Sequence, residues 1–355
     1  MVLAAEIPVK RVYRSRITEA DFNELEFGKY ISDHMLMCDF KDGEWGQPHI
    51  VPFANLSVSP ASLALHYGQT VFEGMKAFRM KDGRINIFRL KKHYDRFVRS
   101  LERMCMAAPS FEVFTSGMAK LISTDKSWVP RQNGSSLYIR PFVFATEARF
   151  GVKISEEYRF IIITGPVPEL YSRPISVKVE TNYVRAVKGG TGFAKCGGNY
   201  GAAFYPTRLA REKGYDQVLW TDGKENKYIE ESGTMNVMFV ISNKLITPPI
   251  SDSILDGVTR DSLLTLANDL GYEVVEKPVS VEELRSSFDR NIITEAFGAG
   301  TAAVVAPISR IGIGNEDFFL PAYNEQSLLN KIKLKLEMIR TGQEEDKYDW
   351  NYVID

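Results

Sequence analysis

Cysteine, histidine and long apolar runs are scarce in this sequence of 355 residues. The three cysteines, Cys38, Cys105 and Cys196, are widely spaced and odd in number, and the four histidines are scattered, so neither a disulfide framework nor a zinc site is indicated. No apolar run reaches the length of a membrane span, and residues 1–16 lack the apolar region of a signal peptide. We therefore expect a cytoplasmic protein with no metal site and no membrane partner.

Excess charge and nucleotide-binding motifs are lacking as well. With 44 Lys and Arg against 45 Asp and Glu, the formal net charge is −1, and no block of one sign stands out. Nucleic acid is not an expected partner, because its phosphates attract strongly basic surfaces. The pattern GK[ST] does not occur, the glycine-rich stretch described below contains no GxGxxG, and no βαβ fingerprint indicates a nicotinamide cofactor.

The length of the chain and the order of its predicted elements indicate two domains of mixed α+β or α/β type. A chain of 355 residues exceeds what a single core usually supports. Turn-forming residues cluster at 170–174, so we predict a small N-terminal α+β domain at 1–171, a linker region at 172–185 and a larger C-terminal domain at 186–355. Residue periodicity predicts strands at 34–40, 49–53, 85–88, 137–144, 160–164, 217–220, 235–241, 272–276 and 291–294, and helices from about 89 and at about 200–213, 258–270, 281–287 and 325–340.

The most unusual stretch is Gly189–Gly201, which reads GGTGFAKCGGNYG and contains a single lysine, Lys195. Glycine forfeits side-chain burial and backbone entropy, so packing alone does not favour this composition. Glycine is suited to positions where the backbone turns tightly or approaches another group closely. An amine in such surroundings has room to reach into a site, and a lysine in a desolvated site is a good nucleophile. The alternative is an exposed loop with a solvated lysine.

Four further features indicate anion or ring binding, although each also has an ordinary structural interpretation. A Gly turn opens the helix predicted from Val258, and helix N-termini bind phosphate. A small-residue turn at 298–302 follows a predicted strand and offers backbone N–H groups. Arg96 carries a guanidinium, the best side-chain partner of a phosphate. Glu231 stands at a strand end, where its carboxylate would hold a pyridine nitrogen protonated.

Seven motifs together resemble those of the branched-chain-amino-acid aminotransferases, which are fold-type IV enzymes that use pyridoxal 5′-phosphate (PLP). They follow the family's order along nearly the whole chain: FEGMKAF (72–78), YDRFVRS (94–100), LYIRP (137–141), FAKCGGNYGAA (193–203), EESGTMN (230–236), DGVTRDSLL (256–264) and TEAFGAGTAA (294–303). The resemblance implies a fold like that of D-amino-acid aminotransferase, with a small N-terminal domain, a larger C-terminal domain and the cofactor at their interface.

The resemblance also implies how the cofactor is held. Lys195 forms a Schiff base with PLP, Tyr200 hydrogen-bonds the ring hydroxyl, and Glu231 pairs with the ring nitrogen. The groups that hold the phosphate are the side chain of Arg96, the backbone N–H groups of Val258 and Thr259, and the hydroxyl of Thr301.

Substrate contacts follow from the same resemblance. Thr301 and Ala302 present backbone N–H groups to the α-carboxylate of the substrate. The residues that surround the side-chain pocket are Phe27, Phe72, Tyr138, Tyr171 and Thr234. Tyr67 and Val152 match positions that a partner subunit contributes, which implies a homodimer.

Arg140 is predicted to bind the distal carboxylate of glutamate. Strand alternation through LYIRPFVF places Tyr138, Arg140 and Phe142 on one face, so the arginine shares its face with aromatic rings. The ordinary alternative is a solvated strand arginine. The resemblance favours the binding role, because this arginine is the distal-carboxylate partner in the family.

The implied reaction is reversible transamination of leucine, isoleucine and valine with 2-oxoglutarate, giving branched-chain 2-oxo acids and glutamate. Lys195 carries the proton, and one site serving two substrates implies ping-pong kinetics. The expected partners are these small molecules. Three alternatives stand beside this function: a D-amino-acid aminotransferase or aminodeoxychorismate lyase, a non-catalytic PLP-binding or scaffold protein, and a nicotinamide oxidoreductase.

Overall fold

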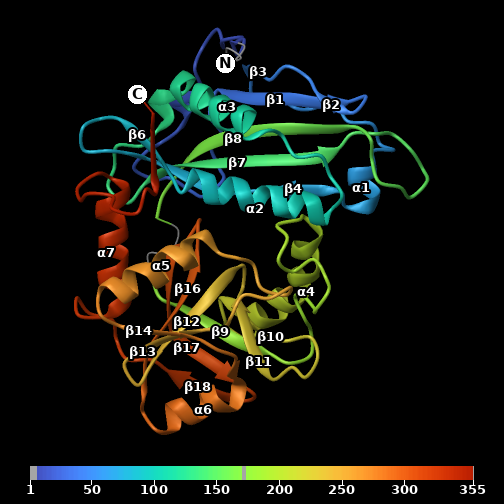
Figure 1. The fold of residues 1–355 in the computed structure, drawn as a ribbon. Helices are drawn as coiled ribbons and strands as arrows, with labels where there is room; N and C mark the ends of the chain where they lie inside the picture. The colour runs from blue at the N-terminus through green and yellow to red at the C-terminus, as the bar shows by residue number, and fades with distance from the viewer. Residues whose placement is uncertain (1–5, 170–172, 355) are drawn as a thin grey trace. The chain divides into compact units, whose positions relative to one another are not determined.

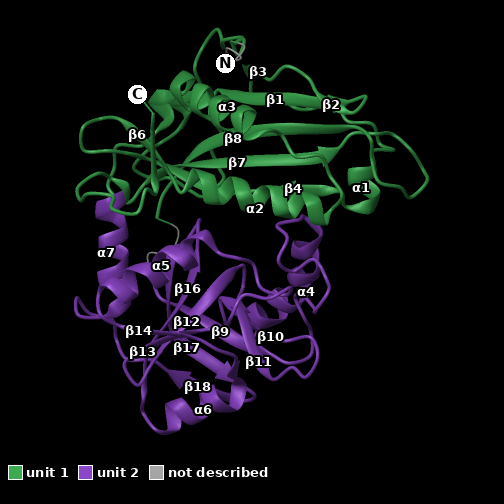
Figure 2. Ribbon diagram, in the orientation of Figure 1, with its two compact units in different colours: residues 1–170, 340–355 green, residues 171–339 purple. Residues whose placement is uncertain are grey.

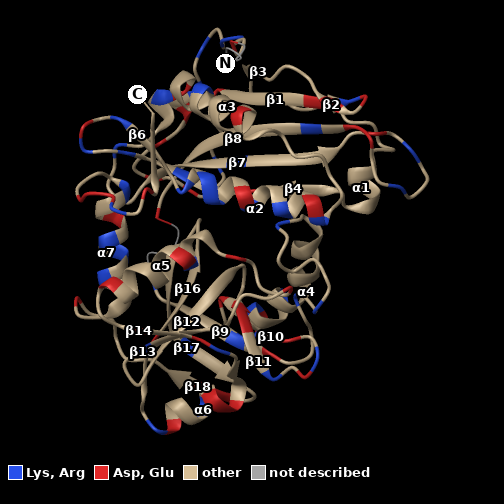
Figure 3. Cartoon of the chain, in the orientation of Figure 1, with Lys and Arg blue, Asp and Glu red and all other residues tan. Residues whose placement is uncertain are grey.

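The computed structural model describes residues 6–169 and 173–354, which fall into two compact units (Figures 1 and 2). Unit 1 comprises Met1–Leu170 and Arg340–Asp355, and unit 2 comprises Tyr171–Ile339. Both units combine strands and helices, in keeping with the mixed α and β character expected from the sequence. Figure 3 shows basic and acidic residues interspersed along the elements of each unit.

Unit 1 is built on an antiparallel sheet of nine strands within its described residues. The strand order is β19-β6-β5-β7-β8-β1-β2, with β3 beside β1 and β4 beside β7. The longest ladder joins β7 and β8, from the pair Ser136 and Val167 to the pair Ala145 and Tyr158. The strands are β1 (His34–Lys41), β2 (Glu44–Trp45), β3 (His49–Pro52), β4 (Thr70–Phe72), β5 (Met75–Arg79), β6 (Ile85–Phe88), β7 (Ser136–Ala145), β8 (Tyr158–Val167) and β19 (Asn351–Ile354).

Two helices cover part of this sheet. The helices of unit 1 are α1 (Leu63–Tyr67), α2 (Leu90–Arg103) and α3 (Phe111–Thr124), with short 3₁₀ turns at Ile17–Glu19 and Lys126–Trp128. α3 packs on β1, and α2 packs on β4. α2 buries Leu90, Phe97 and Leu101, the centre of the apolar stripe that predicted it. Phe97 contacts Phe114 of α3 at 5.8 Å between ring centroids, and both rings are fully buried in the core.

Unit 2 contains a closed ring of strands. In its ten-stranded sheet, the pairings run from β12 through β16, β17, β9, β10 and β11, and the pairing of β11 with β12 closes the ring into a barrel. The strands are β9 (Ile175–Glu180), β10 (Gln217–Thr221), β11 (Tyr228–Ser232), β12 (Met235–Ile241), β13 (Lys244–Thr247), β14 (Glu273–Glu276), β15 (Val279–Ser280), β16 (Ile293–Gly300), β17 (Val304–Ile313) and β18 (Glu316–Phe319), a count that covers the described residues of the unit.

Four helices accompany this sheet in the described part of unit 2. They are α4 (Gly198–Glu212), α5 (Val258–Asp269), α6 (Val281–Asp289) and α7 (Leu328–Arg340). α4 packs on β9 and β10, and α5 packs on β14 and β16. Ser280 caps α6 by accepting a hydrogen bond from the N–H of Glu283. Within the residues described here, no helix is both long and apolar enough to cross a bilayer.

Three differences between the structure and the predicted boundaries affect the domains and the candidate site. Ile175–Glu180 of the predicted linker region forms β9, because this segment pairs with both β10 and β17. Residues 340–355 group with unit 1, because β19 pairs with β6. The strand predicted to end at residue 294 continues to Gly300, because its small residues pair along β12 and β17. The turn predicted at 298–302 therefore begins only at Thr301.

Candidate active site

Lys195 lies in a loop that hydrogen bonds of neighbouring residues hold in one conformation. Its Nζ donates to the hydroxyl of Tyr200 at 3.2 Å, and Tyr200 lies in the first turn of α4. The side chain of Asn199 bonds back across the loop: its amide nitrogen donates to the carbonyl oxygens of Thr191 and Ala194, each at 2.8 Å. Side-chain bonds of asparagine to nearby backbone replace a regular ladder in this manner. The loop therefore presents a half-buried amine on a defined backbone.

Glu231 is a buried carboxylate on β11 with a partner on each oxygen. Oε1 accepts the backbone N–H of Leu255 at 2.8 Å, and Oε2 lies 3.1 Å from Nε of Arg185. The side chain of Glu231 is only 4 % exposed and that of Arg185 only 9 %. An ion withdrawn from water needs such partners, because an unpaired buried charge is costly. An arginine in contact also favours the ionised form of a carboxylate.

The N-terminus of α5 begins three residues after Leu255. Its N-cap residue is Gly257, which has no side chain to accept the N–H groups of the first turn. Nδ2 of Asn236 donates to the carbonyl of Leu255 at 2.9 Å. A Cβ at Gly257 would lie 1.9 Å from Oδ1 of the same asparagine, so only glycine fits here. The N–H groups of Val258 and Thr259 therefore stand at a helix start suited to an anion.

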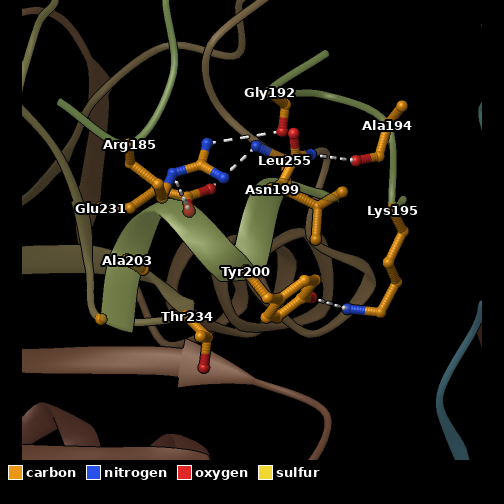
Figure 4. A pocket seen from close by; sticks show the side chains of 11 residues that line it. Arg185, Gly192, Ala194, Lys195, Asn199, Tyr200, Ala203, Glu231, Thr234 and Leu255 are labelled. Atoms are coloured by element: carbon orange, nitrogen blue, oxygen red, sulfur yellow. Dashed lines mark hydrogen bonds and ion pairs between the residues drawn. The ribbon is translucent and has the colours of Figure 1, made fainter. Parts of the chain in front are cut away.

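Lys195, Tyr200 and Glu231 line one cavity of unit 2 together with Leu255, which precedes the start of α5 (Figure 4). Its volume is about 390 Å³, including its opening to solvent. The lining residues are Arg185, Gly192, Ala194, Lys195, Asn199, Tyr200, Ala203, Glu231, Gly233, Thr234 and Leu255. Of the predicted site residues, the structure thus places Lys195, Tyr200, Glu231 and Thr234 around the same space. Across residues 6–169 and 173–354, no cluster of His, Cys, Asp and Glu could hold a metal ion.

Thr301 and Ala302 lie in the turn between β16 and β17. Met235, the residue after Thr234, contacts the positions where Gly298 and Gly300 of β16 would carry a Cβ, so this hairpin adjoins a segment that lines the cavity. The turn is followed by Val304 with a φ of 61°. A β-branched residue seldom adopts this conformation, and such strain gathers at ligand-binding segments.

In unit 1, the predicted side-chain pocket residues form an aromatic cluster around Arg140. The guanidinium lies 4.6 Å from the ring centroid of Phe72 and 5.1 Å from that of Tyr138, and Nη2 donates to the Tyr138 hydroxyl at 3.0 Å. Phe27 meets Tyr138 edge to face at 5.0 Å. Gly74 leaves room for this hydroxyl, because a Cβ there would lie 2.1 Å from it. The shared face predicted from strand alternation is therefore present.

Arg96 lies on α2 in a buried ion pair with Glu73. Nε donates to Oε2 at 2.9 Å and Nη2 to Oε1 at 2.5 Å, while Nδ1 of His93 lies 3.3 Å from Oε1. The side chain of Arg96 is 4 % exposed and that of Glu73 is fully buried. Burial alone would raise the pKa of Glu73, but Arg96 and then His93 outweigh it and hold this pKa well below its usual range. The guanidinium that the resemblance assigns to a phosphate is thus held in a fixed orientation by Glu73.

The remaining predicted residues are placed as follows. Tyr67 ends α1, and its hydroxyl donates to the carbonyl of Phe150. Val152 lies in the loop after β7 and is 80 % exposed. Tyr171 falls outside the described residues.

Sequence reasoning missed Arg185 and Asn199, although both line the cavity. Asn199 had a detectable signal, because an asparagine among glycines often bonds to nearby backbone. Arg185 had none, since its partners Gly192, Glu231 and Ser253 are distant in sequence or offer only a backbone carbonyl.

Comparison with known proteins identifies the class of this fold and site. The family described as amino-transferase class IV matches residues 70–311. The chain belongs to this family.

Its relatives carry a more particular description. The chain is 43 % identical over 339 residues to branched-chain-amino-acid transaminase 1 of Bacillus subtilis, covering 94 % of this chain and 95 % of that protein. It is equally 43 % identical over 339 residues to a probable branched-chain-amino-acid aminotransferase of Staphylococcus epidermidis, with 94 % of each chain covered.

Solved structures agree with this assignment. The branched-chain amino acid aminotransferase of Escherichia coli matches with a TM-score of 0.72 and 28 % identity, over 90 % of this chain and 98 % of that one. A further branched-chain amino acid aminotransferase, solved in complex with N-(5′-phosphopyridoxyl)-L-glutamate, matches with a TM-score of 0.72 and 25 % identity, over 89 % and 97 %. The predicted fold-type IV class, the aminotransferase family and its cofactor PLP are therefore confirmed.

The residues of the cavity fit PLP. The cofactor has an aldehyde, a ring hydroxyl, a ring nitrogen and a phosphate. The cavity offers the amine of Lys195, the phenol of Tyr200 and the buried carboxylate of Glu231 for the first three. The uncapped helix start at Val258 offers N–H groups for the fourth.

We predict that Glu73→Gln destabilises the protein by about 3–5 kcal/mol at pH 7, because it leaves the buried charge of Arg96 uncompensated. The pKa of Glu73 is lower in the folded chain than its ordinary value of 4.5, so its stabilising charge is present above that pH and is lost as the pH falls toward the folded pKa. The difference in the free energy of unfolding between wild type and Glu73→Gln should therefore shrink below about pH 4.5. Urea titrations at several pH values measure it.

Asp82→Asn is the matched control. Asp82 pairs with Arg84 at 2.7 Å, but both side chains are about half exposed, so this substitution should change the unfolding midpoint very little. Equal, small effects of the two substitutions would contradict the structural role of the Glu73–Arg96 pair.

Proposed function

We propose that the chain catalyses reversible transamination of leucine, isoleucine and valine with 2-oxoglutarate, in a ping-pong sequence. The observation that carries this proposal is the single cavity in which the amine of Lys195, the phenol of Tyr200 and the buried carboxylate of Glu231 come together. The names of relatives 40–43 % identical over most of the chain support the branched-chain substrates over the other functions of the fold.

Three residues of the cavity have chemical roles in this proposal. When bound, PLP supplies an electron sink that stabilises negative charge at the substrate Cα. Lys195 attaches the cofactor through Nζ, and the same amine, once released by the substrate amine, takes the proton from Cα. Tyr200, 3.2 Å from that nitrogen, orients it and bonds the ring hydroxyl. Glu231 keeps a positive charge on the ring nitrogen.

Anion contacts complete the binding of cofactor and substrate. We assign the phosphate to the N–H groups of Val258 and Thr259, the hydroxyl of Thr301 and the guanidinium of Arg96, which Glu73 orients. We assign the substrate α-carboxylate to the backbone N–H groups of Thr301 and Ala302.

The substrate side chain is assigned to the aromatic cluster of unit 1. Phe27, Phe72 and Tyr138 offer apolar surface to leucine, isoleucine and valine. The family resemblance assigns Tyr171 and Thr234 to the same side-chain pocket. Glutamate brings a distal carboxylate, which an apolar pocket alone rejects. Arg140, which lies over two of these rings, supplies the compensating charge.

A second copy of the chain is part of this proposal. Phe150 and Val152 are 90 % and 80 % exposed on the loop after β7, although the base of that loop is held by the ion pair of Lys153 with Glu147 at 3.1 Å. Exposed apolar side chains on an anchored loop are typical of an interface. We propose that the protein is a homodimer in which Tyr67 and Val152 act at the partner's site. Its three free cysteines fit a reducing cytoplasm.

Borohydride reduction followed by peptide mapping tests the covalent role of Lys195. The label should fall on Lys195, and Lys195→Ala should lose transamination of all three branched-chain donors with 2-oxoglutarate. Lys188→Ala is the matched control, because Lys188 is exposed seven residues earlier in the same segment. A label on another lysine, or full turnover in Lys195→Ala, would contradict the proposed covalent role of Lys195.

Single-turnover measurements of each half-reaction, followed by the cofactor spectrum, test Arg140. Losing one partner of a buried charge pair costs ~2–5 kcal/mol, so Arg140→Met should slow the glutamate half-reaction by roughly thirtyfold or more. The leucine half-reaction should change much less. Arg159→Met, which removes an arginine paired with Asp39 at the other end of the sheet face, should change neither. Equal losses for leucine and glutamate would make Arg140 a structural residue.

Subunit complementation tests the shared site. Lys195→Ala chains should be inactive alone and Tyr67→Ala chains weakly active, since each lacks one component of every site. In a hybrid dimer, one site combines an intact Lys195 with an intact Tyr67. After random subunit exchange, activity should rise to about a quarter of the wild-type value, because half of the dimers are hybrids with one intact site. No recovery in a mixture that sedimentation shows to be dimeric would contradict the proposal.

A further inference from the structure

Arg185 is the residue of the cavity with the most widely separated partners. Its Nε lies 3.1 Å from Oε2 of Glu231 in an ion pair without hydrogen-bond geometry, and its Nη2 donates to the carbonyl oxygen of Gly192 at 3.4 Å (Figure 4). The same Nη2 donates to the carbonyl oxygen of Ser253. One planar guanidinium therefore joins three segments that are far apart in the sequence. Arginine suits this task because its N–H donors are held in a rigid fork.

Each of the three segments carries a group that the proposed function assigns to the cofactor. Gly192 precedes Lys195 by three residues, and Ser253 precedes the helix start at Val258 by five. Glu231 itself faces the ring nitrogen in that proposal. A contact that fixes these segments against one another therefore fixes the relative positions of the amine, the carboxylate and the helix start.

The packing beneath Arg185 is tight. A Cβ on Gly192 would lie 2.5 Å from Cβ of Ala186 and 2.7 Å from Cα of Ser253. The loop that carries Lys195 and the turn before α5 thus touch backbone to backbone. Close packing leaves them little freedom to slide, so the bonds of Arg185 select one arrangement.

A second carboxyl group, that of Glu230, contacts Ser253. The hydroxyl of Ser253 donates to Oε1 of Glu230, while Oε2 of Glu230 is buried with no hydrogen-bond partner in the described part of the chain. Glu230 is 8 % exposed. Burial raises the pKa of Glu230, although Ser253 and Arg185 act in the opposite direction. Glu230 thus joins the network through the hydroxyl of Ser253, whereas Arg185 pairs directly with Glu231.

We propose that Arg185 is the positioning residue of this cavity, and that Glu230, through Ser253, completes the network that holds Glu231 ionised and aimed at the ring nitrogen. The inference rests on the proposed function, because the three segments that Arg185 holds together are those to which that function assigns cofactor-binding groups. Arg185 acts through Glu231 and takes no part in the transfer of the proton.

Two measurements on the full-length protein test the inference: the dissociation constant of PLP for the apoprotein, and the ¹⁵N chemical shift of bound PLP labelled at the ring nitrogen. The wild type should show a protonated ring nitrogen. Arg185→Gln should weaken PLP binding by roughly tenfold to a hundredfold, the range typical of residues that orient a ligand-binding group, and should move the ¹⁵N shift toward the neutral ring. Arg185→Lys, which keeps the charge without the fork, should fall between them. Glu230→Ala should have a smaller effect in the same direction.

A double-substitution cycle decides whether Arg185 acts through Glu231. In the background of Glu231→Gln, adding Arg185→Gln should weaken PLP binding by less than about threefold, because the shared interaction is already lost. Arg285→Gln, which removes an arginine paired with Glu316 at 2.6 Å in the same unit, should leave both readouts unchanged. Should Arg185→Gln fail to fold, Arg185→Lys alone still has to shift the ¹⁵N signal.

Four results would overturn the inference. Lower thermal stability with unchanged PLP affinity and ¹⁵N shift would make Arg185 merely structural. Additive losses in the double substitution would show that Arg185 does not act through Glu231. A wild type that binds no PLP would overturn the proposed function and this inference with it, whereas a wild type that binds PLP beside Arg185 variants that behave identically would remove only the inference.

Discussion

A buried carboxylate must find partners for both of its oxygens, and the arrangement of the cavity in unit 2 depends on how Glu231 meets this requirement. One oxygen accepts a backbone N–H from Leu255, and the other lies against Arg185. Leu255 belongs to the turn that leads into α5, and Arg185 also bonds the loop that carries Lys195. Compensation of one negative charge therefore brings the lysine loop, the β11 carboxylate and a helix N-terminus into a single register. The barrel of unit 2 also fixes the strand that carries Glu231, because β11 pairs with β10 on one side and with β12 on the other.

The same constraint acts in unit 1 with the charges exchanged. There the group with a functional assignment is a cation, Arg96, and its compensating partner is the carboxylate Glu73. An arginine bonded through two of its nitrogens cannot swing between rotamers, so its orientation is set before any ligand arrives. Glu73 follows β4, whose last residue is Phe72, and Gly74 leaves room for Tyr138. The short segment 72–74 thus serves the aromatic cluster and the arginine at once, which explains why its three residue types occur together.

Sequence patterns predicted the features that depend on residues close together in the chain. The stripe of α2 was evident because its apolar residues recur at helical spacing, and Lys195 was evident because glycines surround it. The helix predicted at about 281–287 is present as α6, capped by the neighbouring Ser280. Arg185 was not predictable in this way, since one of its bonds reaches a carbonyl 68 residues away and no side-chain pattern marks that partner. The end of β16 was misjudged because small residues that resemble a turn pair instead with β12 and β17. A short stretch of sequence does not reveal which distant strand it pairs with or in which register.

The aromatic cluster of unit 1 shows how one surface can serve an apolar and a charged side chain on the proposed function. A guanidinium that lies over the rings of Phe72 and Tyr138 is attracted by their faces, so its charge has a partner even without a bound anion. Its flat surface is weakly hydrated, and an aliphatic side chain that contacts it displaces little bound water. When a carboxylate is present, the in-plane N–H groups remain available, because cation–π attraction uses the face of the guanidinium and hydrogen bonds use its edge. Nε of Arg140, buried and without a hydrogen-bond partner among the described residues, is one such edge group. A lysine ammonium has no flat face that is distinct from its N–H edge. It would therefore have to leave the aromatic rings in order to bind the carboxylate.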